Sequence, residues 1–178
     1  MKVLNLPNML TITRILIIPV FVSSIIYNRY DYALYLFAVA ALTDIFDGLI
    51  ARIKSQKTAL GTFLDPLADK FLLVTSFILF SIYGLIPTWV TITIISRDII
   101  VTTGWVLIYL TAHTSRVEPT MLGKIAVTLQ LVLICYILLH INAPSLPYLH
   151  IYLIWLTSIF TVVSGLHYIY RGLKQTGG

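Results

Sequence analysis

Charged residues are scarce in this chain of 178 residues, of which 11% are charged and 58% are hydrophobic. A soluble domain carries about 25% charged residues. From Ile125 to Tyr170 there is no Asp, Glu, Lys or Arg, and a helix that spans a membrane needs about 20 apolar residues. The composition therefore indicates an integral membrane protein. It excludes a soluble enzyme, a nucleic-acid-binding module and a disordered chain.

Cysteine is almost absent, and the single Cys135 excludes a disulfide within the chain. The 12 Lys and Arg outnumber the 7 Asp and Glu, which gives a net charge of +5. Anionic lipid headgroups attract basic residues near a membrane, so this excess does not indicate nucleic acid as a partner. Arg14 interrupts the first apolar run and no small-residue cleavage site follows it, so we expect a retained helix rather than a signal peptide.

Turn residues divide the chain into six apolar segments, each long enough to cross a bilayer as a helix. The expected helices cover residues 8–27, 32–53, 59–83, 88–112, 120–141 and 148–170. The pattern shows no alternation typical of strands and no linker. We therefore predict an all-α fold, with a single membrane domain of six transmembrane helices over residues 1–178.

The distribution of positive charge predicts the orientation, because Lys and Arg collect in cytoplasmic loops. Seven of these residues flank the predicted helices on one side: Lys2, Arg52, Lys54, Lys57, Arg116, Arg171 and Lys174. Arg29 alone flanks them on the opposite side. Both termini and the two basic loops are therefore expected in the cytoplasm.

Four of the seven acidic residues lie inside predicted spans, where an isolated carboxylate costs at least about 2.5–3.5 kcal/mol to insert. Asp44 and Asp47 are spaced i,i+3, and Asp65 and Asp69 are spaced i,i+4, so each pair shares one helix face. The two helices form an antiparallel hairpin, which places both pairs roughly 6–16 Å below its loop. Four carboxylates that converge there match the oxygen ligands of Mg²⁺, Mn²⁺ or Ca²⁺.

Glycines and basic residues accompany these pairs. Gly48 and Gly61 permit close approach of a helix or a ligand to the backbone. Arg52, Lys54 and Lys57 at the mouth of the hairpin can neutralise phosphates. Two metal ions between the carboxylates would suit phosphoryl transfer, but paired acids could also line a cation path. The spacing alone leaves catalysis and cation transport open.

The segment from Asp44 to Asp69 reads D-x2-D-G-x2-A-R-x8-G-x3-D-x3-D. This spacing resembles the signature of the CDP-alcohol phosphotransferases, integral membrane enzymes of phospholipid synthesis. The matching positions are Asp44, Asp47, Gly48, Ala51, Arg52, Gly61, Asp65 and Asp69. The likeness extends along the chain through LPNMLTITR near its start, SRD at 96–98, and PTMLGK with the later Gln130. Cation transport has no need of the G-x2-A-R segment, so the motif favours the enzyme.

The resemblance implies a reaction in which the hydroxyl of an alcohol attacks the lipid-side phosphorus of CDP-diacylglycerol and releases CMP. It implies that Asp44, Asp47, Asp65 and Asp69 bind two divalent metal ions, Mg²⁺ or Mn²⁺. Asp69 matches the general base of the family, and a carboxylate within hydrogen-bond reach of the hydroxyl suits that role. The positions that match those binding CDP-diacylglycerol are Asn8, Thr11, Gly48, Arg52 and Thr58.

A second group of residues is expected to bind the acceptor alcohol. Lys124 resembles the residue of the family that binds the phosphate of the acceptor. Further candidates for this role are Arg116, Arg97 and Arg14. Arg97 could equally pair with a nearby acid such as Asp98, and Arg14 could equally be a structural tether.

Two branches of the family fit the chain: phosphatidylglycerophosphate synthases use glycerol 3-phosphate, and eukaryotic-type cardiolipin synthases use phosphatidylglycerol. The first branch often carries a Lys and a Thr at the positions of Ala126 and Val127, which favours the second branch. The basic residues Arg116 and Lys124 suit a small phosphomonoester, and we expect glycerol 3-phosphate as the acceptor. The resemblance also implies a homodimer in a bacterial inner membrane, with an active site that faces the cytoplasm.

Overall fold

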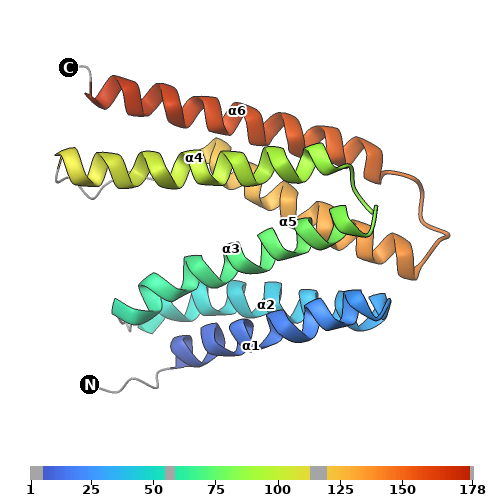
Figure 1. Cartoon of the computed structure of the whole chain (residues 1–178). Helices are drawn as coiled ribbons and strands as arrows, with labels where there is room; N and C mark the ends of the chain where they lie inside the picture. Colours follow the sequence, from blue (N-terminus) through green and yellow to red (C-terminus); the bar gives the residue numbers. More distant parts are fainter. Residues whose placement is uncertain (1–5, 55–58, 113–119, 177–178) are drawn as a thin grey trace. The chain divides into compact units, whose positions relative to one another are not determined.

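The described part of the chain consists of six α-helices and contains no strand (Figure 1). The computed structural model describes the backbone of residues 6–54, 59–112 and 120–176, and the side chains of residues 12–43, 70–104, 120–172 and 174. The helices are α1 (Leu6–Ile26), α2 (Tyr30–Lys54), α3 (Ala59–Ile82), α4 (Thr88–Ala112), α5 (Met121–Asn142) and α6 (His150–Thr176). The predicted all-α fold is confirmed.

Most helix ends lie within two residues of the predicted ones, because turn residues end both the apolar runs and the helices. Asn28 follows α1 with a left-handed φ of 57°, and Gly84 follows α3 with a φ of 69°. The exception is α6, which continues beyond the predicted end at Tyr170 to Thr176. At the end of α6, polar residues end the apolar run but the helix continues through them.

Contacts within the chain divide it into two compact units, which are treated separately. Unit 1 comprises Met1–Leu79 and Cys135–Pro147, and unit 2 comprises Phe80–Ile134 and Tyr148–Gly178. Unit 1 therefore holds α1, α2, most of α3 and the end of α5. Unit 2 holds α4, the larger part of α5 and α6. That the whole chain acts as one domain stays a prediction.

In unit 1, α1 packs against α2 through buried apolar side chains. Phe21 and Ile25 on α1 are fully buried, and the ring of Phe21 lies 6.1 Å from that of Phe37 on α2. Asn142, the last residue of α5, donates a side-chain hydrogen bond of 3.0 Å to the carbonyl of Tyr30. This bond links the end of α5 to the start of α2.

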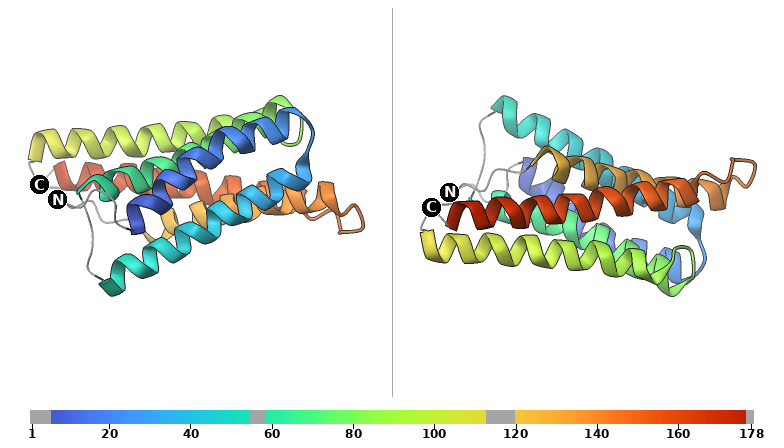
Figure 2. Two further views of the ribbon diagram at one scale, coloured as in Figure 1. Left: turned by 90° about the horizontal axis from the view of Figure 1, so that it is seen from below. Right: turned by 90° about the horizontal axis from the view of Figure 1, so that it is seen from above.

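In unit 2, α4 lies alongside α6 (Figure 2). The rings of Trp89 on α4 and Trp155 on α6 are 5.3 Å apart. The helix α5 also bonds to α6, because Gln130 Nε2 donates to Thr161 Oγ1 at 3.3 Å. Hydrogen bonds between polar side chains hold neighbouring helices together in an apolar environment.

On α6, most of the exposed side chains are apolar and most of the buried ones are polar. Its exposed side chains include Ile151, Tyr152, Trp155, Ile159, Val162 and Leu166. Its buried polar side chains are Thr157, Ser158, Thr161 and Ser164. A helix of a soluble protein has the opposite distribution, so this one is typical of a helix surrounded by lipid.

Two of the described helices are long and apolar enough to cross a bilayer, Met121–Asn142 and His150–Gly172. Shorter apolar helical stretches cover Ile12–Ile26, Tyr30–Thr43 and Lys70–Ile82. Together with the exposed face of α6, they indicate a membrane protein. The topology of six spans and the cytoplasmic termini stay predictions.

The packing of α1 on α2 predicts a difference between two substitutions on α1. Phe21→Ala should lower the free energy of unfolding by about 3 kcal/mol, because it leaves a cavity against Phe37. Leu16→Ala should have a much smaller effect, because Leu16 is 65% exposed. Thermal unfolding of the purified protein in detergent measures both. Equal losses would contradict the packing of α1 described above.

Candidate functional site

The four motif aspartates lie on the two helices of one hairpin in unit 1. Asp44 and Asp47 belong to α2, and Asp65 and Asp69 belong to α3. All four lie within about three helical turns of the connection between α2 and α3. Their side chains lie outside the part that the structure describes, so their convergence on metal ions stays a prediction. Among the side chains that are described, no three of His, Cys, Asp or Glu gather as a metal site would require.

The candidate contacts to CDP-diacylglycerol also belong to unit 1. Asn8 and Thr11 lie on α1, and Gly48 and Arg52 lie on α2. Thr58 falls outside the described residues, and for the other four residues only the backbone is described. The fold therefore assigns these residues to helices, and their contacts stay predicted.

The candidate acceptor ligands are divided between the units. Arg14 on α1 belongs to unit 1 and is fully buried. Arg97 on α4 and Lys124 on α5 both belong to unit 2, where Arg97 is buried and Lys124 is exposed. Arg116 falls outside the described residues.

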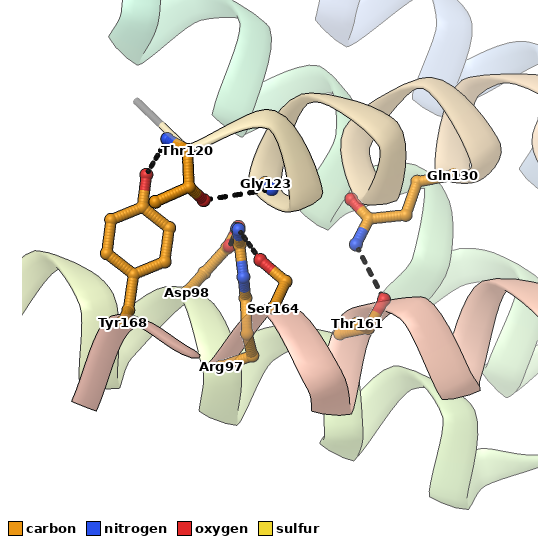
Figure 3. Close-up of polar contacts among 8 residues, drawn as sticks. All are labelled: Arg97, Asp98, Thr120, Gly123, Gln130, Thr161, Ser164 and Tyr168. Atoms are coloured by element: carbon orange, nitrogen blue, oxygen red, sulfur yellow. Dashed lines mark hydrogen bonds and ion pairs between the residues drawn. The ribbon is translucent and has the colours of Figure 1, made fainter. Parts of the chain in front are cut away.

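Arg97 is held by side chains of α4 and α6 (Figure 3). Its Nη1 donates to Asp98 Oδ1 at 2.7 Å, and its Nη2 donates to Ser164 Oγ at 2.8 Å. The guanidinium carbon also lies 5.7 Å from the centre of the Tyr168 ring. The expected pairing of Arg97 with Asp98 is thus present. With only 9% of its side chain exposed, Arg97 has a fixed orientation and a balanced charge.

The start of α5 lies beside the same residues (Figure 3). Thr120 precedes α5 and accepts a hydrogen bond from the Gly123 N–H at its Oγ1, at 3.1 Å. This is the arrangement of an N-cap, in which a hydroxyl satisfies one of the free N–H groups of the first helical turn. The N–H of Thr120 donates in turn to the hydroxyl of Tyr168 on α6, at 3.2 Å.

The predicted site did not include Ser164, Tyr168 or Thr120. The sequence nevertheless contains a pattern that indicates a contact at Ser164 and Tyr168. Polar side chains recur along α6 at Thr157, Thr161, Ser164 and Tyr168, with the spacing of four, three and four residues that places them on one helix face. In a helix that is otherwise apolar, such a stripe indicates a buried polar contact.

Comparison with known proteins identifies what the chain is similar to. A sequence model of the CDP-alcohol phosphatidyltransferase family matches residues 4–163. A probable phosphatidylglycerophosphate synthase of Mycobacterium tuberculosis is 33% identical over 99% of the chain and 86% of the relative.

A CDP-diacylglycerol–glycerol-3-phosphate 3-phosphatidyltransferase of Bacillus subtilis is 38% identical over 92% of the chain and 93% of the relative. The human CMP-forming cardiolipin synthase is 34% identical over 97% of the chain, which spans 62% of that longer protein. Relatives of both branches therefore match almost the whole chain.

The contact between Arg97 and α6 predicts a difference between two buried serines. Ser164→Ala should destabilise the protein by about 1–3 kcal/mol, because it leaves a buried N–H of Arg97 without its acceptor. Ser158→Ala is the matched control, since the Ser158 hydroxyl donates within its own helix, to the carbonyl of Ile154. Thermal unfolding in detergent measures both variants. A loss for Ser158→Ala as large as that for Ser164→Ala would argue against the contact.

Proposed function

The chain belongs to the CDP-alcohol phosphatidyltransferase family, and on that premise we propose that it transfers the phosphatidyl group of CDP-diacylglycerol to glycerol 3-phosphate. The products are phosphatidylglycerophosphate and CMP. The observation that carries this proposal is the similarity to the Bacillus subtilis transferase, which matches nearly the full length of both proteins. The intact aspartate motif on α2 and α3 supports the same reaction.

A cardiolipin synthase that uses phosphatidylglycerol as the acceptor is the second candidate. The similarity to the human cardiolipin synthase favours it, as do Ala126 and Val127 at positions where the other branch often carries Lys and Thr. Against it stands the exposed Lys124, since a solvent-exposed ammonium suits the phosphomonoester of glycerol 3-phosphate. Cation transport is the remote third candidate, and it has no support from the relatives.

We propose that Asp44, Asp47, Asp65 and Asp69 hold two divalent ions, Mg²⁺ or Mn²⁺. When bound, such ions neutralise the phosphates and lower the pKa of the attacking hydroxyl. Asp69 takes the proton of the glycerol 3-phosphate hydroxyl as the new bond to phosphorus forms. The bond between that phosphorus and the CMP oxygen breaks, and CMP leaves with the bonding electron pair.

The remaining candidates bind the two substrates. Asn8, Thr11, Gly48, Arg52 and Thr58 are proposed to bind CDP-diacylglycerol. Lys124 and Arg116 are proposed to bind the phosphate of the acceptor, with Arg97 and Arg14 as further candidates. Among the described acceptor candidates, Arg97 already has two side-chain partners, whereas the exposed side chain of Lys124 is accessible to a ligand. Lys124 is therefore the preferred ligand.

We also propose the membrane arrangement. All six helices cross the membrane, both termini lie in the cytoplasm, and the active site opens to the same side. The alternation of basic loops along the chain supports this orientation. By family resemblance, the protein is a homodimer in a bacterial inner membrane.

An acceptor screen tests the proposed reaction. Purified protein is incubated with labelled CDP-diacylglycerol and, separately, with glycerol 3-phosphate, phosphatidylglycerol, inositol phosphate or serine. CMP release is expected with glycerol 3-phosphate, should stop when a chelator removes the metal, and should return with Mg²⁺ or Mn²⁺. Turnover with phosphatidylglycerol alone would establish the second candidate instead. Ion flux in liposomes without CMP release would support transport.

The proposed role of Asp69 as the base predicts how replacing its carboxylate affects turnover. Asp69→Asn should lower kcat about 100-fold or more, because the amide cannot take the proton of the acceptor hydroxyl. Asp31→Asn is the control, because Asp31 is an exposed carboxylate outside the motif, at the start of α2. CMP release from the two variants is compared at saturating substrate and metal. Full turnover by Asp69→Asn would exclude Asp69 as the base.

A further inference from the structure

Three elements of unit 2 meet at the first turn of α5. Arg97 belongs to α4, Thr120 is the residue directly before α5, and Tyr168 belongs to α6. A Cβ added to Gly123 would lie 3.2 Å from an atom of each of these three side chains. We call these four residues the α5 clamp (Figure 3). A side chain at Gly123 would therefore force at least one of these three neighbours to shift by a few tenths of an ångström.

Thr120 uses three of its polar groups to connect the clamp to α5. Its Oγ1 accepts from the Gly123 N–H, and its carbonyl accepts from the Lys124 N–H at 3.1 Å. Its own N–H donates to the Tyr168 hydroxyl. A continuous chain of hydrogen bonds thus runs from the Tyr168 hydroxyl through Thr120 to the backbone of Lys124.

Arg97 packs against the ring of Tyr168. Its guanidinium lies over that ring and is itself oriented by Asp98 and Ser164. A Cβ at Gly165 would lie 3.3 Å from Arg97 Cγ, so this second glycine makes room for the aliphatic part of Arg97. The guanidinium, the ring and the helix start therefore form one packed polar group inside unit 2.

We infer that Tyr168 is a positioning residue for Lys124, because its hydroxyl fixes, through Thr120, the helical turn from which the Lys124 side chain extends. The inference rests on the proposed role of Lys124 as a ligand of the acceptor phosphate. Tyr168 itself contacts neither substrate in this scheme. It sets where α5 begins, and so it affects binding of the phosphorylated acceptor more than binding of CDP-diacylglycerol.

The two KM values separate this role from a general loss of structure. Tyr168→Phe keeps the ring under Arg97 and removes the hydroxyl that accepts from the Thr120 N–H. It should raise the KM for glycerol 3-phosphate about fivefold, as expected for one lost hydrogen bond. The KM for CDP-diacylglycerol and kcat should change less than about twofold. Tyr170→Phe is the matched control, since Tyr170 lies on α6 and is 67% exposed.

Variants of Thr120 test the next link in the chain of hydrogen bonds. Thr120→Val keeps the shape but removes the cap, and it should raise the KM for glycerol 3-phosphate as Tyr168→Phe does. Thr120→Ser retains the hydroxyl and should restore a KM close to that of the unsubstituted protein. Amide hydrogen exchange of residues 121–128 should be faster in Tyr168→Phe than in Tyr170→Phe, which reports the clamp without any acceptor present.

Each remaining outcome overturns the inference in a different way. Faster exchange with an unchanged KM would mean that the clamp does not position Lys124. A parallel rise of both KM values would mean a general structural role. Lys124→Ala separates this inference from the proposed function. If Lys124→Ala raises the KM for glycerol 3-phosphate and Tyr168→Phe does not, only the inference fails. If Lys124→Ala has no effect, the proposed role of Lys124 fails and the inference fails with it.

Discussion

Several buried polar side chains in unit 2 have their hydrogen-bond partners on a neighbouring helix, which is the arrangement that helices packed in an apolar environment require. Arg97 is the strongest case, since a buried cation is costly unless an acid and further acceptors surround it. Asp98 balances its charge from the same helix, and Ser164 on α6 supplies the second acceptor. The packing of α4 on α6 in unit 2 depends on this requirement, because the two helices have to be placed where Arg97 can reach both partners.

The helices could be predicted from the sequence because each connection contains residues that interrupt an apolar run. Asn28 and Gly84 adopt the left-handed conformation at two of these connections, and both are residue types that tolerate it. The end of α6 could not be predicted in this way, because its last turns are polar but still helical. The length of an apolar run is related to the thickness of a bilayer, whereas the position of a helix end depends on local backbone hydrogen bonds.

The candidate site is predictable only in part for a similar reason. The spacing of the aspartates on α2 and α3 is local information, and it was sufficient to identify the family, which the comparison confirms. The contacts in unit 2 join residues far apart in the chain, 67 residues for Arg97 and Ser164 and 48 for Thr120 and Tyr168. A single sequence shows which faces of a helix are polar, but it does not show which distant residue meets them.

The polar stripe of α6 also bears on the order in which the protein is assembled. Its partners in unit 2 include Arg97, Thr120 and Gln130, and all three precede α6 in the chain. Because a ribosome makes the N-terminal part first, every one of these partners already exists when α6 is synthesised. The hydroxyl groups of α6 therefore meet partners that were synthesised before them, and the packing of α6 completes unit 2.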